Sequence, residues 1–148
     1  MASWRQHSVV ALTIATCAFG AAAIGRAAEN TFPCRWNYTL YVGLHTGSDT
    51  GGLNADCTGI TGRLMLSARL YRSTSGNHTW RLAHSTTHSW TNPSGNRYLE
   101  FGVPCTPGQI RAVFTWILTD RSGHLLAHNT ITTAPVNDPG PGCKYSLG

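Results

Sequence analysis

Apolar and polar residues alternate at every second position over most of the chain after residue 34, and this feature limits the possible fold most. The clearest case is 63–72, where Leu64, Leu66 and Leu70 alternate with polar or long side chains. Successive side chains of a β-strand point to opposite faces, so this period indicates a strand with one buried face. The sequence therefore predicts a domain built from half-buried strands.

Other segments show the same alternation. They are 35–44, 78–90, 98–103, 109–119 and 124–133. Short clusters of Gly, Pro, Asn, Asp and Ser separate them, and no helical period follows residue 34. We expect an all-β fold, an antiparallel β-sandwich of about six to seven strands, with a small β-barrel as the alternative.

Three segments depart from simple alternation. Segment 109–119 is apolar on both faces, with Phe114 and Trp116 on one and Val113 and Ile117 on the other, which predicts a central strand covered on both sides. The stretch 47–62 contains five glycines and little periodicity, so it is predicted to be a long loop. The Pro- and Gly-rich tail 135–142 is predicted to form neither a helix nor a central strand.

The N-terminal segment has the order of a secretory signal peptide. A polar start with Arg5 precedes an apolar run that ends at Gly25, and small residues follow. Gly25 and Ala27 suit the signal peptidase, which predicts cleavage after residue 27. A membrane anchor is the alternative, but no basic cluster follows the run. We expect residues 28–148 to form one extracellular domain without a transmembrane segment.

Four well-separated cysteines lie in the expected mature domain: Cys34, Cys57, Cys105 and Cys143. In an exported chain such cysteines indicate disulfides, and the lack of a close Cys pair argues against a redox or zinc site. Three pairings are possible. If strands run alternately up and down, Cys34, Cys105 and Cys143 fall near one end, and Cys57 lies in a loop that folds back to the first strand. Pairing in sequence order is preferred.

Short motifs also carry a resemblance. Cys34-Arg35-Trp36 opens a strand, Asp56-Cys57-Thr58-Gly59 leads into a strand that ends Leu70-Tyr71-Arg72, and Cys105 precedes the penultimate hairpin. In this order the chain resembles small secreted β-rich proteins common in actinobacteria. That resemblance implies an immunoglobulin-like sandwich and transfers no catalytic residues.

The net charge and the positions of the carboxylates restrict the classes of function that are expected. Without Arg5 and Arg26 the chain has 9 basic and 6 acidic residues, a net charge of +3, and its single arginines do not form a nucleic-acid footprint. They would suit an anionic cell-wall or membrane polymer, although codon usage also explains them. Glu100 and Asp120 are the only carboxylates in or beside predicted strands and form no obvious pair, so no enzyme activity is expected.

Histidines offer one route to a metal site. His84 and His88, like His124 and His128, lie four residues apart in a predicted strand, too far apart along it to share one ion. A site would need one histidine from each strand. The simpler interpretation is that these are polar residues on solvent faces, and no metal or cofactor is expected.

Aromatic residues offer the candidate binding positions, which are Trp90, Trp80, Tyr71 and Tyr98. Exposed rings stack on sugars or enter a partner's pocket, and Trp90, beside a turn, is the preferred exposed anchor. The leading hypothesis is a secreted non-catalytic binding module for a cell-wall polymer, glycan or protein at the cell envelope. A protease inhibitor presenting 103–107 is the second hypothesis, and a small metal-dependent or hydrolytic enzyme is the third.

Overall fold

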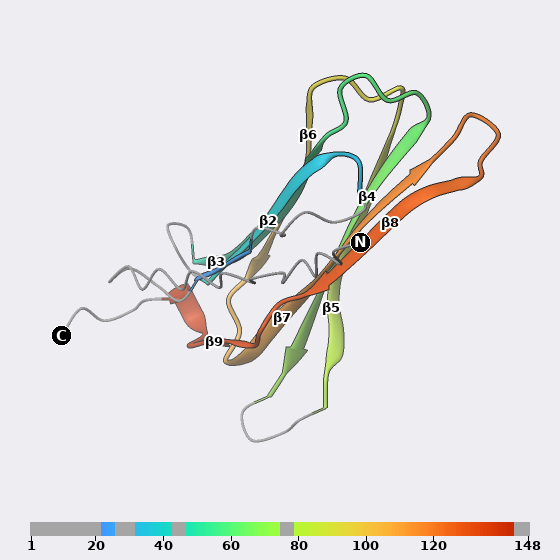
Figure 1. The fold of residues 1–148 in the computed structure, drawn as a ribbon. Helices are drawn as coiled ribbons and strands as arrows, with labels where there is room; N and C mark the ends of the chain where they lie inside the picture. The colour runs from blue at the N-terminus through green and yellow to red at the C-terminus, as the bar shows by residue number, and fades with distance from the viewer. Residues whose placement is uncertain (1–21, 26–31, 43–46, 75–78, 144–148) are drawn as a thin grey trace, which may run out of the picture.

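The structure, a computed structural model, describes residues 22–25, 32–42, 47–74 and 79–143. It is a sandwich of two antiparallel sheets (Figure 1). The strands are β1 (Ala22–Gly25), β2 (Arg35–Val42), β3 (Ser48–Asp56), β4 (Arg63–Ser73), β5 (Arg81–Thr91), β6 (Asn96–Pro104), β7 (Gly108–Thr119), β8 (Leu125–Thr132) and β9 (Val136–Asp138), followed by the short 3₁₀ turn η1 (Pro141–Cys143).

The strand order is that of an immunoglobulin-like sandwich. The small sheet has the order β1-β2-β3-β6, and the large sheet has the order β5-β4-β7-β8, with β9 paired to β7. Strands β2, β3 and β6 correspond to A, B and E of such a sandwich, and β5, β4, β7 and β8 to C′, C, F and G. The two sheets are separate, so the predicted sandwich is confirmed and the barrel is excluded.

The prediction that 47–62 is a long loop is wrong, because most of this segment forms β3, the strand between β2 and β6 in the small sheet. Its inward positions include the small residues Gly51 and Ala55, which hide the alternation. Gly51 is required by packing: a Cβ there would lie 2.6 Å from Cζ of Phe101. A glycine needed for a close approach between strands was therefore mistaken for a turn glycine.

Strand β7 is central in the large sheet, as predicted. Phe114 and Trp116 are fully buried between the sheets. Val113 and Ile117 lie on the other face of β7 and are only half-buried, so the expected cover on that face is absent among the described residues. The two faces of this sheet therefore differ: the inner face is buried, and the described residues leave the outer face partly exposed.

Two short strands, β1 and β9, lie in segments that the sequence analysis does not assign to a predicted strand. β9 pairs with the start of β7 at the sheet periphery, which agrees with a tail that supplies no central strand. β1 pairs with β2 and falls inside the predicted signal peptide; the rest of that peptide lies outside the described residues. Among the described residues, no helix has the length and apolar character needed to cross a membrane.

Candidate functional site

The two disulfides link Cys34 to Cys57 and Cys105 to Cys143, with Cα–Cα distances of 4.6 and 5.7 Å. The predicted pairing is confirmed, but the reasoning about its geometry is wrong. Cys34 and Cys57 lie where β2 begins and β3 ends, whereas Cys105 follows the end of β6 that pairs with the start of β3. Each disulfide therefore closes a different end of the sandwich.

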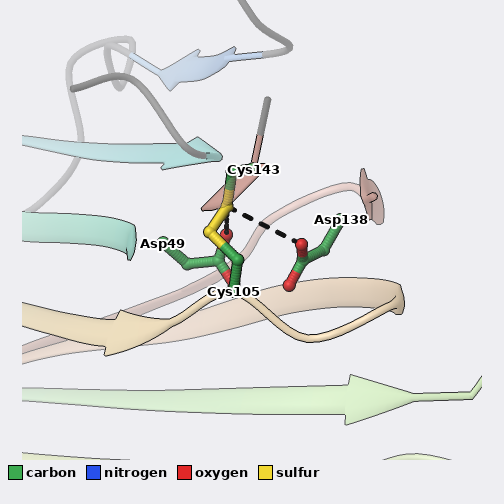
Figure 2. A group of neighbouring side chains, drawn as sticks. All are labelled: Asp49, Cys105, Asp138 and Cys143. Atoms are coloured by element: carbon green, nitrogen blue, oxygen red, sulfur yellow. Dashed lines mark hydrogen bonds between the residues drawn. A yellow bond between two sulfur atoms is a disulfide. The ribbon is translucent and has the colours of Figure 1, made fainter. Parts of the chain in front are cut away.

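A buried charged cluster lies at the Cys105–Cys143 end. Asp49 on β3 and Asp138 on β9 are both buried, and Figure 2 shows both carboxyl groups close to the disulfide. The Sγ of Cys143 lies 3.7 Å from Asp49 Oδ1 and 3.8 Å from Asp138 Oδ1. Arg72 on β4 donates from Nη2 to Asp49 Oδ2 at 2.7 Å, and the same nitrogen lies 3.7 Å from Asp138 Oδ2.

Backbone groups complete this cluster. Thr106 and Gly140 donate their N–H groups to Asp138 at 2.6 and 2.9 Å, and Arg72 donates to the carbonyl of Pro104 at 2.6 Å. Burial raises the pKa of Asp49 to about 7, with its hydrogen bond and charge repulsion from Asp138 adding to the effect and Arg72 opposing it. The cluster joins both sheets to the C-terminal tail.

The chemistry of the cluster fits an internal ion pair better than a metal centre. Asp49, Asp138 and the two cysteines each have a possible ligand atom, all within 4.8 Å of one another. However, metal ions bind cysteine as the thiolate, and both sulfurs are used in the disulfide. Arg72 already supplies a positive charge between the carboxylates, so we assign the cluster a structural role.

The sequence-based alternative of a shared histidine metal site is wrong. Strands β5 and β8 lie at opposite edges of the large sheet, about 14 Å apart at the usual strand spacing. His84 lies 5.9 Å from the ring of Phe101, and His88 lies 4.5 Å from that of Trp90. These two histidines therefore pack at the rim of the core.

The carboxylates named from the sequence do not converge. Asp120 accepts hydrogen bonds from the N–H groups of Ser122 and His124 at 2.8 and 2.9 Å, and the bond from the His124 backbone is the main cause of its lowered pKa. Glu100 is exposed on β6, in the other sheet. Asp120 therefore stabilises the turn to which it belongs.

The segment proposed as an inhibitory loop is held against the domain. Val103 and Pro104 belong to β6, and only three residues connect β6 to β7. Cys105 donates its N–H to the carbonyl of Gly47, while Thr106 N–H and the Pro104 carbonyl are engaged by the charged cluster. The backbone of 104–106 is therefore tied to the rest of the domain by hydrogen bonds.

The four candidate aromatic residues lie in three different parts of the structure. Trp90 does lie beside a turn, but it is half-buried and packs against the core, so the expectation that it is exposed is wrong. Trp80 and Tyr71 both lie beside Arg111, whose guanidinium is 4.3 Å from the Trp80 ring centre and 5.9 Å from that of Tyr71. Tyr98 is 59% exposed on the small sheet.

The outer face of the large sheet, called the arginine face below, is the most distinctive surface. Its strand positions carry Arg63, Arg69 and Arg111, and no Asp or Glu among the described residues of β4, β5, β7 and β8. A row of hydroxyl groups crosses all four strands at Thr87, Ser67, Thr115 and Thr130. Thr87 donates to Ser67 at 3.0 Å, and the hydroxyl oxygens of the other two are 3.3 Å apart.

An open hollow of about 610 Å³ lies at one end of the arginine face. Arg63 and Arg121 line it together with Met65, Ile117 and one carboxylate, Asp120, which lies in the turn after β7. Sequence reasoning missed this surface because it weighed each arginine singly. The alternation that predicts the strands also places Arg63 and Arg69 on one face, and this was the available signal.

Neither a protein-family model nor a curated protein sequence matches this chain. The fold and surfaces themselves therefore define its class: an immunoglobulin-like sandwich closed by two disulfides, with a basic, hydroxyl-rich outer face.

Proposed function

We propose that the protein is a secreted, non-catalytic binding module that attaches to an anionic polymer of the cell envelope through its arginine face. The observation that carries this proposal is the presence of three arginines and no carboxylate on the described strands of that face. Two disulfides agree with an oxidising, extracellular location. The resemblance to secreted actinobacterial proteins is a further part of the proposal.

The groups on this face suit phosphate or carboxylate ligands. A guanidinium group donates two parallel hydrogen bonds to either anion, and hydroxyl groups donate single bonds beside it. The rings of Trp80 and Tyr71 restrict Arg111, which lowers the entropy lost when it binds. An open sheet surface with repeated groups favours a polymer over a small ligand, which usually occupies a deep apolar pocket.

The non-catalytic part of the proposal rests on the arrangement of acidic groups. Asp49 and Asp138 are buried against Arg72, and Asp120 is engaged by its own turn. Glycoside hydrolysis needs two carboxyl groups on opposite sides of one bond, and nucleophilic catalysis needs a base beside the nucleophile. The described residues that bear carboxyl groups offer neither arrangement on the arginine face.

Sedimentation with insoluble bacterial cell-wall fragments tests this function, with protein purified after secretion. We expect saturable binding that weakens with added salt, no release of soluble wall products, and competition by soluble polyphosphate. Exchanging Arg63, Arg69 and Arg111 together for Gln should weaken binding at least tenfold. Binding that ignores salt and this triple substitution, or release of wall products, would contradict the proposal.

A matched pair of single substitutions provides the control. Arg69→Gln on the arginine face and Arg35→Gln on the small sheet remove the same charge from exposed strand positions. If the face and not the net charge is responsible, only Arg69→Gln should weaken binding. Equal losses would indicate nonspecific attraction.

A further inference from the structure

A second open hollow, of about 480 Å³, lies on the outer face of the small sheet. Its side chains come from Thr39 and Tyr41 on β2, Thr50 on β3 and Glu100 on β6, and Gly102 lies among them. The register places Tyr41, Thr50 and Gly102 in one row across three strands. This surface, called the sugar hollow below, is separate from the arginine face because it belongs to the other sheet.

Gly102 leaves this hollow open, and neither its backbone conformation nor its described neighbours require glycine at this position. Its φ is not positive, and among the described residues a Cβ there would meet only Cγ2 of Thr50, at an ordinary 3.8 Å. Gly51, by contrast, makes room for Phe101. Glycine inside a strand costs about 0.5 to 1 kcal/mol relative to alanine. Neither backbone conformation nor packing explains this residue, whereas an occupant of the hollow would.

The lining indicates the chemistry of the occupant. Among the described residues, the side chains on this outer face are the Tyr41 ring, the Thr39 and Thr50 hydroxyl groups and the Glu100 carboxylate, without an aliphatic side chain. Phe101 points inward and is buried in the core beneath the hollow. A protein partner would need an apolar anchor pocket, and an anionic polymer would be repelled by Glu100. A neutral or amino sugar fits, because its C–H face stacks on an aromatic ring and its hydroxyl groups donate to a carboxylate.

The same face extends beyond the hollow to Tyr98. Tyr98 lies on β6 opposite Asn54, and its hydroxyl accepts a hydrogen bond from Asn96 at 2.6 Å. Tyr41 and Tyr98 are separated by four positions along the strands and two strand spacings, on the order of 17 Å between Cα atoms. Two aromatic groups at this separation suit a chain of several sugars.

We propose that the sugar hollow and Tyr98 bind a neutral or amino-sugar polysaccharide chain, at a site distinct from the arginine face. The site is independent of the proposed attachment to an anionic polymer. One molecule would then contact two kinds of envelope polymer through its two outer faces.

Nuclear magnetic resonance titration of the ¹⁵N-labelled protein with cellohexaose, N-acetylchitohexaose and maltohexaose tests this site. We expect at least one hexasaccharide to shift the backbone resonances of Thr50, Gly102 and Tyr98. Gly102→Val should weaken that binding at least tenfold while leaving the melting temperature unchanged or higher, because valine favours strands and its Cβ would lie at an ordinary 3.8 Å from Cγ2 of Thr50. Tyr98→Ala should weaken it as well.

Ser85→Val is the matched control, since it adds the same side chain to an exposed strand position of the large sheet. It should leave oligosaccharide binding unchanged. The inference is overturned if none of the three probes binds, if Gly102→Val binds normally, or if the shifts lie on the arginine face. Wall sedimentation that still depends on Arg69 would, in that case, leave the proposed function intact.

Discussion

The two ends of the sandwich are both closed by a disulfide, but different forces hold the side chains beside it. At the Cys34–Cys57 end, Trp36 packs on Trp116 with ring centres 4.5 Å apart, and Trp116 Nε1 donates to the carbonyl of Asn54 at 2.8 Å. At the Cys105–Cys143 end, the buried groups are the charged cluster of Asp49, Arg72 and Asp138.

This difference shows how one domain can combine an end held mainly by apolar packing with an end held by buried charges. Burial of aromatic rings stabilises the first end by removing apolar surface from water, and the packing of these rings involves no change of charge. The second end depends on three charges whose removal from water is costly unless each is compensated. Its stability therefore depends on every member of the cluster and on its protonation.

The largest expected effect is at the aromatic end. Trp116→Ala should lower the free energy of unfolding by about 3 to 5 kcal/mol, because the fully buried ring leaves a cavity and its hydrogen bond is lost. Trp90→Ala should cost less, since Trp90 is half-buried on the edge strand β5. Urea denaturation of both variants measures the difference. If Trp90→Ala is the more destabilising, the core has been assigned incorrectly.

Arg72 should give the next largest effect, at the charged end. Arg72→Gln leaves Asp49 and Asp138 facing each other without a cation, and should cost about 3 kcal/mol at pH 8, as for other broken buried ion pairs. The loss should shrink at pH 5, where Asp49 is protonated. Arg69→Gln, on the opposite face of β4, should change the free energy of unfolding by no more than about 0.5 kcal/mol. Equal effects of the two substitutions would refute the role of the cluster.

The sequence predicted the aromatic end better than the charged end. Alternation identifies strands whose inward residues are large and apolar, and it therefore placed Phe114 and Trp116 in the core. It missed β3, whose inward residues include Gly51 and Ala55. Asp49 was consequently assigned to a loop, and its contact with Asp138 in the tail arises only when the two sheets pack.

One local signal of the charged cluster was present. Arg72 continues the inward series Leu64, Leu66, Ala68 and Leu70 of β4. A basic residue on the apolar face of a strand requires a buried partner, which predicts a carboxylate at this end. The surfaces were only partly predictable: Tyr71 and Trp80 were named, but their pairing through Arg111 depends on the register between β4 and β7.

The most specific effect concerns Asp49 and pH. Because its pKa is raised to about 7, the folded protein keeps a proton on Asp49 that the unfolded chain releases near pH 4. The contribution of this group to stability is therefore complete below pH 4 and is lost as pH rises towards 7, at no more than about 1.4 kcal/mol per pH unit. Asp49→Asn should remove this dependence of the free energy of unfolding on pH, since the amide replaces the protonated carboxyl group. Asp56→Asn, at a half-buried carboxylate that accepts hydrogen bonds from Thr58, should retain the pH dependence. Melting temperatures of the variants measured from pH 4 to pH 8 test this prediction. If the melting temperature of Asp49→Asn changes with pH as in the original protein, another group is responsible for the pH dependence.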